Sequence, residues 1–137
     1  MSQTEWHETQ IRVRYKDTDR MGVVYYGNYL TFFEVGRTEF MRDLGLSYSS
    51  LEAEGYALAV TEAYAKYHAN VDYDTKIIVK TAITNLTKVR VRFDYEVIDR
   101  EENILVTGYT VHASINENKK AARIPASLRD LIEKSLK

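Results

Sequence analysis

Alternation of apolar and polar residues is the clearest pattern in this chain, and it predicts β-strands. Between Val89 and Val97, valine and aromatic residues alternate with arginine, aspartate and glutamate. A similar alternation places Ile11, Val13 and Tyr15 on one face of an earlier segment. A period of two is typical of a strand with one buried face. The predicted strands cover residues 9–15, 57–69, 75–84, 89–97 and 104–115.

A helical period replaces this alternation over residues 28–44. Apolar residues recur three and four positions apart, and additional aromatic residues widen the apolar side. Asn28 is a good candidate for the N-cap, and Gly45 suits the C-terminal cap. We expect a helix so broadly apolar to be surrounded by protein on most sides. Shorter helices are predicted at residues 49–54 and 126–136.

The order of these elements indicates an α+β fold. A long helix follows the first strand, and the other four strands come one after another with mostly short connections. Strands with short connections pair in an antiparallel manner, and the resulting sheet has one long apolar helix to cover. We therefore predict an antiparallel five-stranded sheet wrapped around a long central helix, in a single domain over residues 1–137.

Composition limits the functions that the chain can have. Its 137 residues carry a formal net charge of -1, which gives no sign of binding to nucleic acid or to a membrane surface. There is no cysteine, so disulfides, thiolate zinc sites and a cysteine nucleophile are excluded. No apolar run approaches the ~18 residues of a membrane span, and the N-terminus lacks the apolar core of a signal peptide. We therefore expect a cytoplasmic protein.

The turn after the first strand contains two carboxylates, Asp17 and Asp19. On one interpretation, both carboxylates accept hydrogen bonds from nearby backbone N–H groups and only stabilise the turn. On the other interpretation, a carboxylate is held beside a substrate as a nucleophile or general base. The apolar residues 23–26 that follow indicate a packed turn, which favours the second interpretation.

The start of the long helix, at Tyr26-Gly27-Asn28, is the second candidate for chemistry. The first N–H groups of a helix have no partner within the helix and carry partial positive charge. Directed at a carbonyl group, they would act as an oxyanion hole, with each well-placed donor worth roughly 3 kcal/mol. Alternatively, Asn28 caps these groups and nothing else binds there. The spacing leaves both interpretations open.

Other charged residues allow a structural and a functional interpretation. A basic set forms either a solvated face or a patch for phosphates, such as those of a nucleotide-bearing cofactor. Glu34 and Arg37 lie three residues apart on the long helix, so we expect an ion pair. The three histidines are far apart in the sequence and offer no metal-binding spacing. The basic set comprises Lys88, Arg90, Arg92, Lys119, Lys120 and Arg123.

The run Tyr15–Tyr29, continued by residues 34–39, resembles the acyl-CoA thioesterases of the YbgC and 4-hydroxybenzoyl-CoA thioesterase family. Its most specific part is the Asp-x-x-Gly-Val-Val-Tyr-Tyr core. The resemblance covers nearly the whole chain and implies the hotdog fold, in which an antiparallel sheet wraps a central helix. Two later segments are also similar to the family, namely Tyr73-Asp74 with residues 76–79, and Arg123-Ile124-Pro125.

The resemblance implies roles for single residues. Asp19 matches the catalytic aspartate of the family, and Tyr26 matches the residue whose backbone N–H polarises the thioester carbonyl. Asp17 matches the first aspartate of the motif, for which we expect a structural role. The implied substrate-binding residues are Gly22, Val23, Val24 and Tyr25 in the loop, and Lys88 and Arg90 on the strand that approaches the CoA phosphates.

The chain departs from the family pattern at two places. Some relatives have a histidine where this chain has Tyr26, so an acid or base role for that histidine does not apply here. The family often has Pro-Ala before the segment at Tyr73, whereas this chain reads Asn70-Val71-Asp72. The second difference concerns the shape of the adjoining loop and the substrate preference.

We therefore expect an enzyme that hydrolyses an acyl-CoA thioester to a carboxylic acid and free CoA. CoA is part of the substrate, and neither a metal nor another cofactor is expected. The resemblance also implies a homodimer or homotetramer whose sheets pair edge to edge, with the site at the interface. The alternative is a hotdog module that binds acyl-CoA without catalysis, as a sensor or partner-binding subunit. The sequence leaves the acyl group open.

Overall fold

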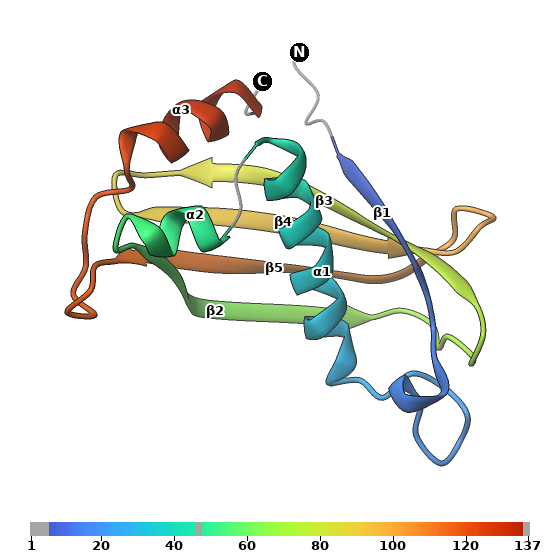
Figure 1. Cartoon of the computed structure of the whole chain (residues 1–137). Helices are drawn as coiled ribbons and strands as arrows, with labels where there is room; N and C mark the ends of the chain where they lie inside the picture. Colours follow the sequence, from blue (N-terminus) through green and yellow to red (C-terminus); the bar gives the residue numbers. More distant parts are fainter. Residues whose placement is uncertain (1–5, 46–47, 136–137) are drawn as a thin grey trace.

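The computed structural model describes residues 6–45 and 48–135. It contains a five-stranded antiparallel sheet in the order β1-β3-β4-β5-β2, with helix α1 lying across one face (Figure 1). The predicted α+β architecture is therefore confirmed. The strands are β1 (His7–Arg12), β2 (Ala57–Tyr67), β3 (Lys76–Leu86), β4 (Arg90–Ile98) and β5 (Ile104–Ile115), the helices are α1 (Asn28–Asp43), α2 (Tyr48–Ala53) and α3 (Ala126–Ser135), and a 3₁₀ turn, η1, covers Tyr15–Asp17.

The boundaries of β2 to β5 and of α2 agree with the predictions to within two residues. The predicted end of the last helix at residue 136 lies outside the described residues. No helix among residues 6–45 and 48–135 is long and apolar enough to span a membrane.

Strand β1 is shorter than the alternation of residues predicts, because the chain turns after Val13. The N–H of Val13 still donates to the carbonyl of Thr75 at 2.8 Å. The Asp17 carboxylate then accepts the N–H of Arg14 at 2.9 Å and bends the backbone into η1. Tyr15 lies in this turn and is 78% exposed, so its predicted place on the buried face of a strand is wrong.

Helix α1 has a different N-terminal cap from the predicted one. Gly27 is the N-cap, and Asn28 is the first helical residue. The prediction for Asn28 is wrong because its side-chain amide instead donates to the carbonyl of Asp17 at 2.8 Å. At the other end, Gly45 has a φ of +94° and donates its N–H to Arg42 at 3.0 Å, as expected of a C-terminal cap.

One broad face of α1 is buried against the concave side of the sheet (Figure 1). The opposite side is open, since Leu30 is 43% exposed and Val35 is 36% exposed. The expectation that protein surrounds this helix on most sides is therefore wrong for the single chain. The buried residues of α1 are Tyr29, Phe32, Phe33, Gly36, Arg37, Phe40 and Met41.

The centre of the core is the contact of α1 with β3, β4 and β5. The rings of Phe33 and Tyr95 stack with centroids 4.3 Å apart. A β-carbon on Gly108 would lie 2.7 Å from the Phe33 ring and 2.3 Å from a β2 carbonyl oxygen. A β-carbon on Gly36 would lie 2.6 Å from a β3 hydroxyl. Two glycines therefore set how deeply the helix lies in the sheet.

A line of polar side chains crosses this core. Arg37 donates to the hydroxyl of Tyr95 at 3.1 Å, and that hydroxyl lies 2.7 Å from the hydroxyl of Thr110. Thr110 in turn lies 2.8 Å from Nε2 of His112. The predicted Glu34–Arg37 ion pair is confirmed at 3.9 Å. Burial, together with the charge of Arg37, lowers the pKa of His112 to about 4.

Strands β1 and β2 form the two edges of the sheet. β2 has 11 residues and exposes the large side chains of Val60, Tyr64 and Tyr67. A long edge strand with exposed apolar side chains is open to pairing with another strand.

Candidate active site

The loop before α1 folds back on itself as a small hairpin that displays Asp19. Thr18 and Val24 form an isolated antiparallel bridge, and the N–H of Asp19 donates to the carbonyl of Val23 at 2.9 Å. Gly22, at the tip, has a φ of +78°, a conformation that glycine adopts without strain. The hairpin lies beyond one end of α1, at the lower right of Figure 1.

Both carboxylates of the hairpin accept a nearby backbone N–H. Oδ2 of Asp17 binds the N–H of Arg14, and Oδ1 of Asp19 binds the N–H of Met21 at 2.8 Å. The turn-stabilising contacts that the sequence allowed are thus present for both residues. Within the described part of the chain, Oδ2 of Asp19 makes no hydrogen bond. One oxygen of Asp19 therefore remains available to a substrate or a water molecule.

The hairpin is only partly packed. Val24 is 6% exposed, and its N–H donates to Val71 at 2.8 Å. Met21 at the tip is 84% exposed, and Asp19 and Gly22 are exposed as well. The expectation of a packed turn is therefore confirmed for Val24, and it is wrong for the tip and for Tyr25 and Tyr26, which are 46% and 63% exposed. In one chain the candidate carboxylate faces open space, where a second molecule has access.

Three hydrogen bonds tie the start of α1 to the hairpin. The carbonyl of Asp17 accepts the N–H of Tyr25 at 2.9 Å and the side-chain amide of Asn28 at 2.8 Å. The N–H of Asn28 donates to the carbonyl of Tyr25 at 2.9 Å. Across residues 6–45 and 48–135, no acceptor is bound to the N–H of Tyr26 or of Gly27. The interpretation in which Asn28 caps these groups is therefore wrong.

Tyr67, at the end of β2, joins this site although the sequence analysis did not single it out. Its hydroxyl donates to the carbonyl of Tyr26 at 3.2 Å, across 41 residues of sequence. Its ring meets that of Tyr26 edge-on at 6.3 Å and that of Tyr29 at 5.5 Å. Burial raises the pKa of Tyr29 to about 12, so this phenol stays protonated at neutral pH. No local motif marks Tyr67, since only the fold brings it to the helix.

The predicted basic set separates in the structure. Lys88 and Arg123 line a groove of about 390 Å³, together with Arg129, which the sequence analysis missed because α3 had first to be placed. Arg92 lies outside this groove, where it pairs with Asp94 at 2.8 Å and lies 4.0 Å from the ring centroid of Tyr109. The other groove residues are Tyr56, Ile124, Pro125 and Ala126.

Arg90, Lys119 and Lys120 are exposed but do not line this groove. Their predicted phosphate contacts therefore remain predictions.

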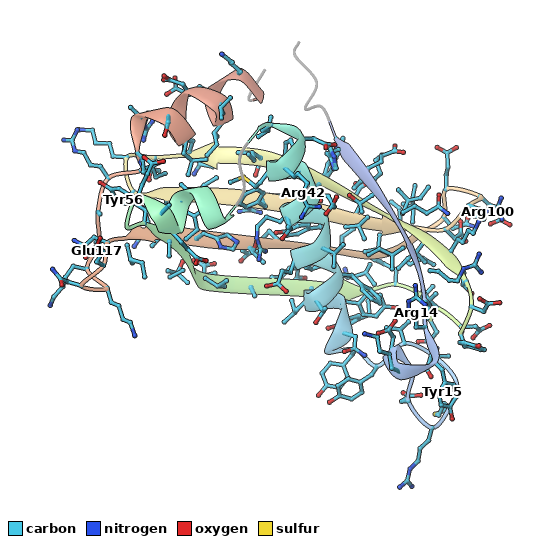
Figure 2. The ribbon with its side chains drawn as sticks, in the orientation of Figure 1. Arg14, Tyr15, Arg42, Tyr56, Arg100 and Glu117 are labelled. Carbon is cyan, nitrogen blue, oxygen red and sulfur yellow. The ribbon has the colours of Figure 1, made fainter. Side chains whose placement is uncertain are left out.

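The groove and the Asp19 hairpin lie at opposite ends of the sheet in one chain. Tyr56 precedes β2, and Tyr67 closes it 11 residues later, a length of about 36 Å at 3.3 Å per residue. Figure 2 shows Tyr56 at one end of the molecule and Arg14 and Tyr15, beside the hairpin, at the other. One chain therefore does not bring Lys88 and Arg90 together with Asp19.

Histidines and metal ligands do not gather at this site. His7 pairs with Asp43 at 2.6 Å, and His68 lies 3.0 Å from the hydroxyl of Thr107. The described residues contain no group of three histidine, cysteine, aspartate or glutamate side chains that could hold a metal ion.

Comparisons with known proteins give the family and the fold of the chain. The thioesterase-like superfamily profile matches residues 13–132. The acyl-CoA thioester hydrolase YbgC of Escherichia coli O6:H1 is 34% identical over 95 residues, which are 69% of this chain and 71% of the relative. The acyl-acyl carrier protein thioesterase ATL3 of Arabidopsis thaliana is 30% identical over 129 residues, 92% of this chain and 67% of the relative.

A solved structure extends the match to the fold. The DHNA-CoA thioesterase of Staphylococcus aureus superposes with a TM-score of 0.90 at 32% identity, covering 94% of this chain and 89% of that one. The order of elements and the wrapped helix are those expected of the hotdog fold. The chain therefore belongs to the thioesterase-like superfamily and has the hotdog fold of the thioester hydrolases that it matches.

Proposed function

We propose that this protein is an acyl-CoA thioesterase whose catalytic carboxylate is Asp19. The observation that carries the proposal is the pair of unbound N–H groups at Tyr26 and Gly27, tied through Asp17 to the hairpin that displays Asp19. Donors fixed before the reaction stabilise a developing oxyanion without reorganisation. Substrates of this class are also named for the YbgC and Staphylococcus aureus relatives.

Two routes use the free oxygen of Asp19. As a general base, Asp19 takes a proton from water while the water oxygen attacks the thioester carbon. As a nucleophile, it attacks that carbon itself, and water then hydrolyses the mixed anhydride. In both routes the carbonyl oxygen becomes an oxyanion held by the helix-start N–H groups. The C–S bond then breaks, CoA leaves as a thiol after protonation, and the acid is released.

The cationic groove supplies a place for the nucleotide part of CoA. Lys88 and Arg123 bring positive charge to one groove, Arg129 adds a guanidinium that also pairs with Glu133 at 3.3 Å, and Tyr56 adds an aromatic face. Guanidinium and ammonium groups form charge-assisted hydrogen bonds with phosphates. A substrate on a carrier protein presents no such free nucleotide, so the groove favours CoA as the carrier.

A second copy of the chain would bring its groove close to the Asp19 hairpin of the first copy. β2 is an exposed edge strand. The groove lies beside its first residue, whereas Tyr67, its last residue, bonds the peptide before α1. Two β2 strands related by a twofold axis run antiparallel, so the start of each lies beside the end of the other. The complete site would then combine Asp19 of one chain with the groove of its partner.

Substitution of Asp19 by asparagine tests the proposal, because it keeps the size and removes the charge. We expect the wild type to hydrolyse members of an acyl-CoA panel and Asp19→Asn to lose at least about 100-fold in kcat. The matched control is Asp130→Asn on the exposed side of α3, which should keep full activity. Wild-type turnover by folded Asp19→Asn would refute the role of Asp19. Binding of acyl-CoA without any turnover by the wild type would instead support the non-catalytic module.

Mixing two variants tests the composite site. Asp19→Asn and the double variant Arg123→Ala with Arg129→Ala are each expected to have low activity on acyl-CoA. After dissociation and reassociation, half of the dimers contain one chain of each kind, and one of their two sites is intact. About a quarter of the wild-type activity should therefore return. A mixture that stays as inactive as its components would place both halves of the site in one chain.

A further inference from the structure

The Tyr67 hydroxyl bonds the peptide that begins α1. It donates to the carbonyl of Tyr26 at 3.2 Å from the last residue of β2. The same carbonyl also accepts the N–H of Tyr29 at 3.3 Å. Ring contacts of Tyr67 with Tyr26 and Tyr29 fix the direction from which the hydroxyl approaches. The oxygen of this peptide thus has two donors.

The other end of the same peptide carries the N–H of Gly27. The Tyr26 carbonyl and the Gly27 N–H belong to one planar, conjugated unit, so polarisation of one affects the other. A hydrogen bond to the oxygen strengthens the N–H as a donor, because linked hydrogen bonds polarise one another. Within the described residues the Gly27 N–H has no acceptor, so the strengthened donor is free for a ligand.

We propose that Tyr67 is a positioning residue of the oxyanion hole: its hydroxyl orients and polarises the Tyr26–Gly27 peptide, so that the Gly27 N–H acts beside that of Tyr26. The inference rests on the proposed thioesterase function. Negative charge develops on the thioester oxygen in the transition state, so a stronger donor lowers the barrier more than it tightens substrate binding. Loss of the hydroxyl should therefore reduce kcat and leave KM unchanged.

The test compares two tyrosine-to-phenylalanine variants. Tyr67→Phe removes the hydroxyl and keeps the ring contacts, and we expect kcat to fall about five-fold at constant KM. Tyr109→Phe is the matched control, because it removes a hydroxyl that donates to Glu62 at 3.1 Å on another part of the sheet. The control should keep wild-type kcat. A Tyr67→Phe variant with a raised KM and unchanged kcat would overturn the inference.

Two further measurements separate this role from a purely structural one. A 3-fluorotyrosine at position 67 alone is a stronger donor than tyrosine, so kcat at mildly acidic pH should equal or exceed that of the wild type. The amide proton of Gly27 should shift upfield in Tyr67→Phe but not in Tyr109→Phe, as measured by NMR on the free protein. An unchanged Gly27 resonance would refute the inference. That measurement tests the polarisation of the peptide separately from the proposed function, which would be refuted if the wild type hydrolysed no acyl-CoA.

Discussion

The start and the middle of α1 differ in how they are held, and the difference separates function from stability. The start of the helix is half-buried at Gly27 and Asn28 and is tied to the Asp19 hairpin by hydrogen bonds through Asp17 and Asn28. The middle of the helix is buried, with Phe33 stacked on Tyr95 and over Gly108. Hydrogen bonds place donors at an open site, whereas close packing supplies the free energy of folding.

This contrast predicts that changes in the middle of the helix reduce stability most. Gly108→Ala should lower the free energy of unfolding by about 3 kcal/mol, because the β-carbon would meet a backbone oxygen as well as the Phe33 ring. Gly36→Ala is the matched comparison, since its close neighbours are side chains and alanine favours a helix by about 1 kcal/mol. Urea denaturation should show a clearly smaller loss for Gly36→Ala. Equal losses would contradict the packing argument.

The buried polar line should make the same region sensitive to acid. Folding lowers the pKa of His112 from 6.5 to about 4, so the folded state resists protonation that the unfolded state accepts. The contribution of His112 to stability is therefore complete above pH 6.5 and is lost as the pH falls from 6.5 towards 4. Between pH 7 and pH 5, the loss should be about 2 kcal/mol.

A variant with no titrating group at this position isolates the effect of His112. His112→Gln should remove this part of the pH dependence, measured as the difference in denaturation midpoints between pH 7 and pH 5. The matched control, His68→Gln, replaces an exposed histidine and should keep the wild-type slope. An identical slope in His112→Gln and the wild type would show that His112 is not the titrating group.

The smallest predicted loss of stability lies at the helix start. Asn28→Ala removes the side-chain donor to the Asp17 carbonyl and should cost about 1 kcal/mol, since Tyr25 still donates to that oxygen. Activity should suffer more than stability, with kcat lower by about ten-fold, because the donors and Asp19 lose their fixed geometry. The exposed Asn118→Ala serves as a control. Unchanged kcat in Asn28→Ala would break the contrast between the two regions.

The errors of the sequence analysis gather where a single hydrogen bond to the hairpin decides the local structure. Tyr15 continues the alternation of apolar and polar residues in the first strand. The Asp17 carboxylate nevertheless accepts the N–H of Arg14, and the chain turns into η1 at Tyr15. Asn28 is a residue type favoured at the N-cap, yet its side-chain amide donates to the backbone carbonyl of Asp17 instead. In both cases a hydrogen bond to Asp17, at its carboxylate or at its backbone carbonyl, prevailed over a regular pattern. Patterns that rest on burial, such as the alternation in β4, have no such competitor.

The sequence by itself determined the α+β order of elements, the five strands and the motif from Asp17 to Tyr26, because period and turn chemistry are local properties. Only the tertiary structure decided that Tyr67 reaches the Tyr26 carbonyl and that Arg129 joins Lys88 and Arg123. It also decided that the groove and Asp19 lie at opposite ends of β2. Such relations depend on strand order and helix placement, which bring together residues that no spacing in the sequence connects.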